Sequence, residues 1–359
     1  MKIGILSMQK ILNYGSFLQA FSLKKQFEKM GHDVYFIDIE KGTQIVPGAK
    51  KEAKGSILKK FDRYFLKRIQ NYLMYKKMSK IHIEDYTKYL QTVKTLPSGK
   101  IFDLVVIGSD EVFNCLNPSP WGFSKQLFGD VKNAKKVVTY AASCGFTDFK
   151  GVQNAGIVGE LKSALDKISE FSVRDANTFD FVQSITEKEP LIHLDPVFIS
   201  DYDENIVNCK FKKPYLLVYA YSNRIANKKE IKAIKNYAKK NKLEILCVGM
   251  QQRWCKNNIT ASAFELLGYV KNATCIVTDT FHGTVFSIKY NKRFVSLVRD
   301  SNSNKLGGLL KQFGLFDRAI LDIDAFNEVL DCDIDFTNAN ALISNGQQRT
   351  KDYFNSICS

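Results

Sequence analysis

Short apolar runs alternate with stretches of helical spacing along most of the chain, and this order constrains the fold more than any other feature. Residues 2–6 are a short apolar run, and residues 15–30 carry apolar side chains at the spacing of an α-helix. Gly31 ends that helix, and residues 34–39 form a second apolar run. A strand, a helix and a strand in succession make a βαβ unit, and such units build parallel sheets.

The same pattern begins again in the second half, after His193. At about 150 residues per domain, a chain of 359 residues suggests two domains. The sequence therefore predicts an α/β fold with two Rossmann-like, doubly wound domains that face a cleft. We expect an N-terminal domain over 1–190, a C-terminal domain over 191–345, and a C-terminal helix over 346–359 that packs back on the N-terminal domain. In such sheets, ligands bind at the carboxyl ends of the strands.

Composition narrows the classes of function. Lys and Arg number 52 against 37 Asp and Glu, which gives a net charge of +15 and favours anionic partners. No apolar run approaches the ~18 residues of a membrane span, and the apolar start is too short for a signal peptide. The eight cysteines include no pair at CxxC spacing, so we expect no metal site. We expect reduced, mostly buried thiols in a cytoplasmic protein.

The segment from residue 50 to residue 80 is unusually basic. It holds eleven Lys or Arg against two acidic residues, and its apolar residues follow helical spacing. A basic amphipathic helix can lie on an anionic membrane. It can equally pack its apolar stripe on the domain and leave a charged face in solvent. The sequence leaves both interpretations open.

The most informative motif is Thr-Asp-Thr-Phe-His-Gly-Thr at 278–284. It follows an apolar strand and precedes a helix that we expect from Thr284, so it lies at a strand end and a helix N-terminus. Backbone N–H groups and the helix dipole there favour an anion. His282 in the same turn can give or take a proton near neutral pH. A histidine in a loop is also often structural, but this position favours a functional one.

Three further motifs occupy comparable positions. Ser-Val-Arg-Asp at 172–175 places Arg174, a fork-shaped cation suited to carboxylate or phosphate, between a strand and a helix. An arginine that pairs with a neighbouring acid would give the same pattern. Ser109 and Asp110 follow another strand, where they can bond sugar hydroxyls or simply form a turn. The last motif, Asn-Tyr-Gly-Ser at 13–16, is not GxGxxG, so the dinucleotide fingerprint is absent.

Taken in order, these motifs resemble the polysaccharide pyruvyl transferase family. The resemblance covers most of the chain, and the block around His282 is its most specific part. The segments that carry it are Asn13-Tyr-Gly15, Leu18-Gln-Ala20, Gly31-His-Asp-Val34 with Ile37-Asp38, Val106-Ile-Gly-Ser-Asp110, Tyr140-Ala-Ala-Ser143, Ser172-Val-Arg-Asp175, Asp195-Pro196 and 278–287. Members resemble two-domain glycosyltransferases of the B type, which agrees with the second start of the strand–helix pattern.

The resemblance implies transfer of a pyruvyl group from phosphoenolpyruvate to two hydroxyls of a sugar, which forms a cyclic ketal. It implies a role in capsule or surface-polysaccharide biosynthesis and no cofactor. The acceptor in such pathways is often a sugar on a polyprenyl diphosphate at the inner membrane face. Peripheral contact of a cytoplasmic enzyme with an anionic membrane would fit the basic segment.

Residue by residue, the resemblance implies that His282 is the general acid. Arg174 would bind the donor carboxylate or phosphate, and the donor phosphate would be supported by Thr280, Gly283 and Thr284. The acceptor would face Asn13, Tyr14, Ser109 and Asp110. Some members have a basic residue directly before the histidine, whereas this chain has Phe281. Arg224, Arg299 or Lys305 are the candidates to supply that charge.

Two other functions remain open from the sequence. A glycosyltransferase that uses a nucleotide sugar would occupy the same two-domain fold. A basic nucleic-acid-binding protein would combine aromatic and basic residues, and such residues do lie together between residues 64 and 75. Because aromatics at helical spacing are more often packing residues, we expect no nucleic-acid partner.

Overall fold

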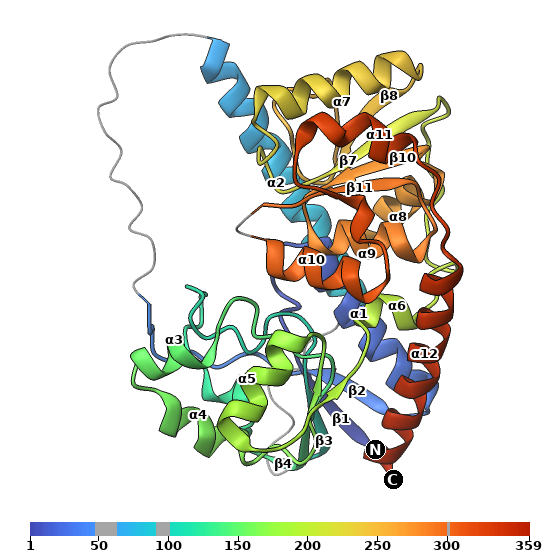
Figure 1. Ribbon diagram of the computed structural model, residues 1–359. Coiled ribbons are helices and arrows are strands. Elements are labelled where there is room, and N and C mark those ends of the chain that lie inside the picture. Colours follow the sequence, from blue (N-terminus) through green and yellow to red (C-terminus); the bar gives the residue numbers. More distant parts are fainter. Residues whose placement is uncertain (47–62, 91–100, 300–301) are drawn as a thin grey trace. The chain divides into compact units, whose positions relative to one another are not determined.

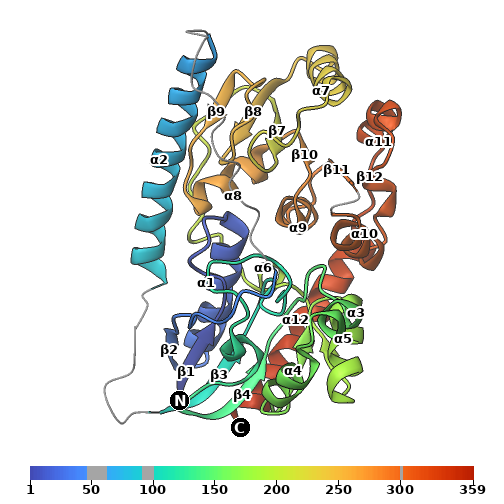
Figure 2. The same ribbon diagram turned by 90° about the vertical axis from the view of Figure 1, so that its left-hand side faces the viewer.

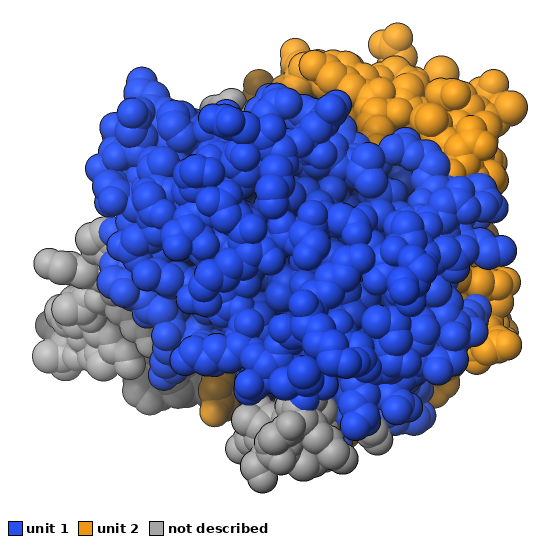
Figure 3. All heavy atoms as spheres, turned by 90° about the horizontal axis from the view of Figure 1, so that it is seen from below, with its two compact units in different colours: residues 1–61, 86–200, 346–359 blue, residues 62–85, 201–345 orange. Residues whose placement is uncertain are grey.

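The computed structural model describes residues 1–46, 63–90, 101–299 and 302–359 (Figure 1). The chain divides into two compact units, which Figure 3 distinguishes by colour. Unit 1 comprises residues 1–61, 86–200 and 346–359, and unit 2 comprises residues 62–85 and 201–345. Each unit contains a parallel sheet with helices between successive strands, which confirms the predicted α/β fold.

Within its described residues, unit 1 has a four-stranded parallel sheet of order β2-β1-β3-β4. Single parallel bridges continue this sheet from β4 to β5, which pairs with β6. The elements are β1 (Lys2–Leu6), α1 (Tyr14–Lys29), β2 (Asp33–Phe36), β3 (Phe102–Ile107), β4 (Ala134–Thr139), α3 (Phe149–Asn154), α4 (Val158–Leu165), β5 (Ser172–Val173), α5 (Ala176–Thr186), β6 (Leu191–Ile192) and α6 (Pro196–Ile199). The chain leaves β1 for β2 and then returns to β3 on the other side, so the strand order reverses between β1 and β3.

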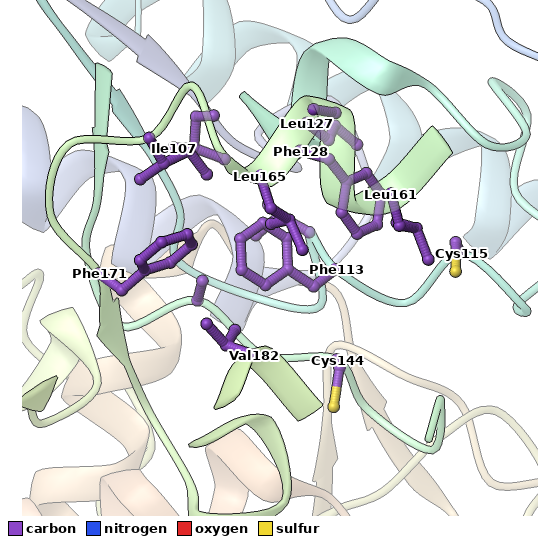
Figure 4. Close-up of a cluster of buried hydrophobic side chains, with 14 of the residues drawn as sticks. Ile107, Phe113, Cys115, Leu127, Phe128, Cys144, Leu161, Leu165, Phe171 and Val182 are labelled. Carbon is purple, nitrogen blue, oxygen red and sulfur yellow. The ribbon is translucent and has the colours of Figure 1, made fainter. Parts of the chain in front are cut away.

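The central strand β3 of unit 1 is apolar over residues 104–107 because both faces of the sheet are covered there. Successive side chains of a strand point to opposite faces. Val105 and Ile107 join a buried cluster with Leu161, Leu165 and other residues of α4 and α5 (Figure 4). Leu104 and Val106 of β3 are also fully buried, and they face the opposite side.

The C-terminal part of α12 (Thr337–Cys358) covers this opposite face. Tyr353 donates a hydrogen bond from its hydroxyl to the carbonyl of Thr139, at 2.8 Å. The ring of Phe354 lies 4.6 Å from that of Phe27 on α1 and 4.8 Å from that of Tyr140. These aromatic contacts hold the last turns of the chain in unit 1.

Unit 2 has a six-stranded parallel sheet of order β12-β11-β10-β7-β8-β9 in its described residues. Its elements are β7 (Tyr215–Tyr219), α7 (Lys228–Lys240), β8 (Glu244–Val248), β9 (Asn257–Ile259), α8 (Ala263–Asn272), β10 (Cys275–Thr278), α9 (Phe281–Lys289), β11 (Phe294–Leu297), α10 (Ser303–Gln312), β12 (Ala319–Ile320) and α11 (Phe326–Asp331). The chain runs outward from β7 to β9, then returns to β10 on the other side of β7. The strand order of this sheet therefore reverses between β7 and β10, which is where ligands bind in open α/β sheets.

Residues 63–80 of the basic segment lie in one long helix, α2 (Arg63–Tyr89), which Figure 2 shows as a continuous rod. Residues 50–62 of that segment lie outside the described residues. None of the helices in the described ranges is both long and apolar enough to cross a membrane. Six of the eight cysteines are buried, which agrees with the expectation of mostly buried thiols.

Candidate functional site

In unit 2, the motif around His282 forms a strand, a tight turn and a helix. The chain leaves β10 at Thr278, and Thr280 caps α9 by accepting a hydrogen bond from the N–H of Gly283 to its hydroxyl, at 2.9 Å. The helix begins at Phe281 rather than at Thr284 as predicted, because a threonine with extended backbone is a favourable cap three residues earlier. His282 consequently lies in the first helical turn, where the helix dipole favours an anion.

The imidazole of His282 lies among aromatic rings. The residue is 7% exposed, and its ring centroid is 5.3 Å from that of Phe281 and 6.1 Å from that of Phe286. Rings on both sides restrict the orientations that the imidazole can adopt. A histidine confined in this way at the carboxyl end of a central strand is a suitable proton donor for a ligand bound there.

The other three residues predicted for the donor have structural roles in this turn. Thr280 uses its hydroxyl as the helix cap, and Thr284 hydrogen-bonds Ser296 at 2.7 Å within the buried side of unit 2. A Cβ on Gly283 would collide with the hydroxyl oxygens of Thr278 and Thr280, so only glycine permits this close packing. Their contact with a donor stays a prediction.

An ion-pair network surrounds the same turn. Asp279 has a fully buried side chain, and it accepts a hydrogen bond from the backbone N–H of Tyr221 at 3.2 Å. Its carboxylate pairs with Nε of Arg224 at 3.0 Å and lies 3.9 Å from Nε of Arg299. Burial raises the pKa of Asp279, although Arg224 beside it favours the ionised form. These groups follow the carboxyl ends of β7, β10 and β11, so they lie beside the point between β7 and β10 where the strand order reverses.

The two arginines differ in how their charge is used. Arg299 donates from both terminal nitrogens to Glu230 on α7, at 2.7 and 3.1 Å. Arg224 holds Asp279 through its Nε, its side chain is 28% exposed, and its guanidinium carbon is 5.5 Å from the centroid of the Tyr221 ring. The two side chains are almost equally exposed, at 28% and 27%, and they differ in that Glu230 holds both terminal nitrogens of Arg299. The network was not predicted, although a single glutamate among the lysines of α7 was a visible signal.

In unit 1, Arg174 lies between β5 and α5 as predicted, but it is buried. Its NH1 donates to Asp195 at 2.9 Å, and the two side chains are 5% and 1% exposed. The second oxygen of Asp195 accepts the N–H of Val197 and caps the short helix α6. The arginine is thus paired with an acid, the alternative that the sequence left open, and Asp195 was missed as its partner.

The predicted acceptor residues gather at the N-terminus of α1. Asn13 caps the helix by accepting the N–H of Gly15 at 2.8 Å. Ser16 donates to a carboxylate oxygen of Asp110 at 2.6 Å, so the end of β3 is tied to the first turn of α1. Tyr14 and Ser109 are buried, whereas Asn13 and Asp110 are partly exposed. The group lies at the reversal of strand order between β1 and β3.

The backbone connects this group to Arg174 along one sheet edge. Ser143 donates its N–H to the carbonyl of Asp110 at 2.9 Å, and Arg174 donates its N–H to the carbonyl of Ala142 at 3.0 Å. Five of the predicted site residues therefore share the carboxyl edge of unit 1, and the other four lie at the corresponding edge of unit 2. Among the described residues, no group of three or more His, Cys, Asp or Glu is placed to hold a metal ion.

Solved structures that resemble this chain include enzymes of nucleotide sugars. UDP-GlcNAc 2-epimerase of Methanocaldococcus jannaschii, in complex with UDP-GlcNAc and UDP, is 14% identical, covers 99% of each chain and has a TM-score of 0.49. A Streptomyces glycosyltransferase in complex with thymidine diphosphate is 13% identical, covers 97% of this chain and 96% of its own, and has a TM-score of 0.44. Spinosyn rhamnosyltransferase is 10% identical, covers 97% and 95%, and has a TM-score of 0.45.

No curated protein matches the chain at a significant level. The family model for polysaccharide pyruvyl transferases matches residues 13–301, a range that includes the nine predicted catalytic, donor and acceptor residues. Because the match spans most of the chain, the protein belongs to the polysaccharide pyruvyl transferase family.

Proposed function

We propose that this protein transfers a pyruvyl group from phosphoenolpyruvate to two hydroxyls of one sugar, in the biosynthesis of a capsule or surface polysaccharide. Family membership supports a transferase. The observation that carries the proposal is the position of His282, in the first turn of α9 at the central reversal of strand order in unit 2. A proton donor beside an anion-binding helix end is what the chemistry of an enol phosphate requires.

The reaction balances with one proton donor and two sugar hydroxyls. His282 protonates the methylene carbon of phosphoenolpyruvate, and the first sugar hydroxyl forms a bond to the central carbon and loses its proton. The bond from the central carbon to the phosphate oxygen then breaks, and the second hydroxyl closes the ketal ring and loses its proton. One of the two released protons restores His282, and the other leaves with hydrogen phosphate.

Arg224 is our candidate for the donor phosphate. Asp279 fixes the guanidinium through Nε, so its position is set before a ligand binds. Both terminal nitrogens of Arg299 are engaged by Glu230, which offsets its charge. A phosphate at the N-terminus of α9 would meet the helix dipole and one partly exposed guanidinium, and both become more effective as water leaves the site. Arg174 belongs to unit 1, and its contact with the donor carboxylate stays a separate prediction.

Asp110 is our candidate for the sugar. Its carboxylate accepts a hydrogen bond from Ser16 at 2.6 Å and remains partly exposed. A carboxylate in this position can orient a sugar hydroxyl and accept its proton as the hydroxyl attacks. Asn13 lies at the same helix end and can add a polar contact to the sugar.

The test is a titration of the full chain with phosphoenolpyruvate by calorimetry, with a panel of nucleotide sugars in parallel, followed by assay of phosphate release with candidate sugars. We expect saturable binding of phosphoenolpyruvate. We expect His282→Gln to lower turnover about 10²- to 10⁴-fold, the usual loss for a general acid, with a smaller change in donor affinity. Near-normal turnover in this variant would remove His282 from the mechanism. Binding of a nucleotide sugar in place of phosphoenolpyruvate would indicate a glycosyltransferase.

Arg224→Gln tests the phosphate contact, and Arg293→Gln is its matched control. Both arginines lie in unit 2, are partly exposed and pair with one aspartate, and Arg293 pairs with Asp333 at the far end of β11. We expect weaker binding of phosphoenolpyruvate in Arg224→Gln only. Equal affinity in the two variants would exclude Arg224 as a donor ligand and leave the role of His282 intact.

A further inference from the structure

Large apolar side chains are exposed together on one helix of unit 2. In α2, Tyr72, Leu73, Tyr75 and Ile83 are between 56% and 64% exposed. These four residues fall within twelve positions of a single helix, whereas the other large exposed apolar side chains of the described chain are scattered. Apolar residues that gather on a surface in this way mark a contact with another molecule or with a membrane.

Lysines lie between these apolar side chains. Tyr72, Lys76 and Lys80 follow one another at four-residue steps, so they line one face of the helix, and Ile83 continues it. Lys77 stands beside this face, next to Leu73. Lys76 and Lys77 are exposed, and the side chain of Lys80 is 79% exposed, with its ammonium 3.9 Å from a carboxylate oxygen of Glu84. We call the face formed by Tyr72, Leu73, Tyr75, Lys76, Lys77, Lys80 and Ile83 the α2 face.

The opposite side of the helix packs within unit 2. Met78 and His82, one turn apart, are 7% and 6% exposed. Asp85 accepts the backbone N–H of Ala263 at the start of α8, at 3.0 Å. One side of the helix is therefore buried, whereas the side chains of the α2 face are exposed.

We infer that the α2 face docks on an anionic membrane surface. Lysines near such a surface are attracted to its charge, while tyrosines lie at the level of the headgroups and aliphatic side chains enter the acyl region. Protein interfaces, by contrast, are depleted in lysine. A nucleic acid would attract the lysines and stack on the tyrosines, but it offers no hydrocarbon in which Leu73 and Ile83 could be buried. This inference does not rest on the proposed function.

A second basic helix provides a matched control. In α7, Lys228, Lys232 and Lys239 are exposed, but the large apolar side chains of this helix are buried or partly buried. Three lysines can thus be neutralised in either helix. In α2 they lie beside exposed apolar side chains, and in α7 they do not. If charge alone attracted the protein to a membrane, both sets of lysines would contribute similarly.

The test is co-sedimentation of the full chain with vesicles of phosphatidylglycerol and phosphatidylcholine in equal parts, and with vesicles of phosphatidylcholine alone. We expect binding to the anionic vesicles only. The triple variant Lys76→Gln, Lys77→Gln, Lys80→Gln should bind about 10²-fold more weakly, since each lysine contributes about a factor of five. Tyr72→Ser with Leu73→Ser should weaken binding at least tenfold, and Lys228→Gln, Lys232→Gln, Lys239→Gln no more than about threefold.

Thermal unfolding of each variant checks that the chain remains folded, which the exposure of these side chains leads us to expect. Absence of binding to anionic vesicles would overturn the inference, as would an equal loss in the α7 triple variant. Binding of single-stranded RNA that depends on the same three lysines, without vesicle binding, would identify the α2 face as a nucleic-acid site. A dimer that Tyr72→Ser and Leu73→Ser dissociate, without vesicle binding, would identify a second copy as its partner.

Discussion

The carboxyl edges of the two sheets each present an arginine–aspartate pair, and the pairs differ in exposure. In unit 1, the side chains of Arg174 and Asp195 are 5% and 1% exposed. In unit 2, Asp279 is equally buried, but Arg224 is 28% exposed. In unit 1 both members of the pair are buried, so the pair holds together the loops that follow β5 and β6. In unit 2 the carboxylate is buried and the guanidinium is partly exposed, so part of the arginine lies at the surface. The exposure of the side chains therefore distinguishes Arg174 from Arg224, whereas the sequence motifs do not.

The largest expected difference is in stability. Arg174→Ala would leave the carboxylate of Asp195 buried without its counter-ion, and loss of one partner of a buried pair usually costs about 3–5 kcal/mol. We expect the free energy of unfolding, measured by chemical denaturation, to fall by that amount. Arg174→Ala can thus abolish activity simply by unfolding the chain. Donor affinity should therefore be measured in the double variant Arg174→Gln, Asp195→Asn, in which a neutral hydrogen bond replaces the ion pair.

Arg224→Ala is the counterpart in unit 2. Asp279 keeps the N–H of Tyr221, and its raised pKa lets it take up a proton more readily than an ordinary carboxyl. We therefore expect a smaller loss of stability than for Arg174→Ala. Equal losses in the two variants would show that exposure does not distinguish the two pairs.

A fall in pH should also change the stability of the two sheet edges in different ways. His193 follows β6 in unit 1, is 5% exposed and hydrogen-bonds Ser172 through Nδ1 at 2.8 Å. Burial lowers the pKa of His193 to about 4, with a smaller contribution from Arg349. A lowered pKa means that the folded state binds fewer protons than the unfolded state, in which histidine titrates near 6.5. The stability linked to His193 is complete above about pH 6.5 and decreases as the pH falls toward 4, by up to about 3 kcal/mol.

The measurement is the free energy of unfolding of the wild type and of His193→Gln at several pH values. The range runs from about 7.5 to about 4, so that it covers the pKa of His193 in the unfolded and in the folded state. The difference between the two proteins isolates His193 from the other titrating groups. We expect the wild type to lose more stability than the variant over this range. Asp279 has the opposite sign, because a raised carboxyl pKa favours the folded state as the pH falls. Parallel pH curves for wild type and variant would contradict the burial of His193.

The sequence predicted most strands and most helices because their signal is local. The run 104–107 is apolar at every position, and this is typical of a strand covered on both faces. The short elements β6, β9 and β12 were missed, because two or three residues carry no period. The start of α9 was placed three residues late, since the capping role of Thr280 depends on backbone angles that the sequence alone does not fix.

The candidate site was predicted as a set of motifs but not as a set of contacts. The turn that holds His282 was identified because strand, small polar residues and helix follow one another without interruption. Asp195 and Glu230 were missed as partners of the arginines, because they lie 21 and 69 residues away from them in the chain. Long-range pairing decides which arginine is buried, and only the folded structure reveals it. The individual site roles and the domain ranges of the sequence analysis stay predictions.

The smallest expected effect concerns the packing of the turn in unit 2. Gly283→Ala would place a Cβ against the hydroxyl oxygens of Thr278 and Thr280, and both are fixed, one by the carbonyl of Tyr219 and the other by capping α9. Since neither can move without losing its hydrogen bond, we expect a loss of about 1–3 kcal/mol, as for overpacking in a core. Thermal or chemical denaturation measures it.

Gly308→Ala in α10 is the matched control in the same unit, because a Cβ there meets no atom within 4 Å. Alanine favours the helix over glycine, so this variant should be more stable by about 0.5–1 kcal/mol. The two substitutions are chemically identical and should therefore change the free energy of unfolding in opposite directions. If Gly283→Ala is also neutral or stabilising, the turn is looser than its contacts indicate. His282, one residue before Gly283, would then lack the rigid support that a positioned proton donor needs.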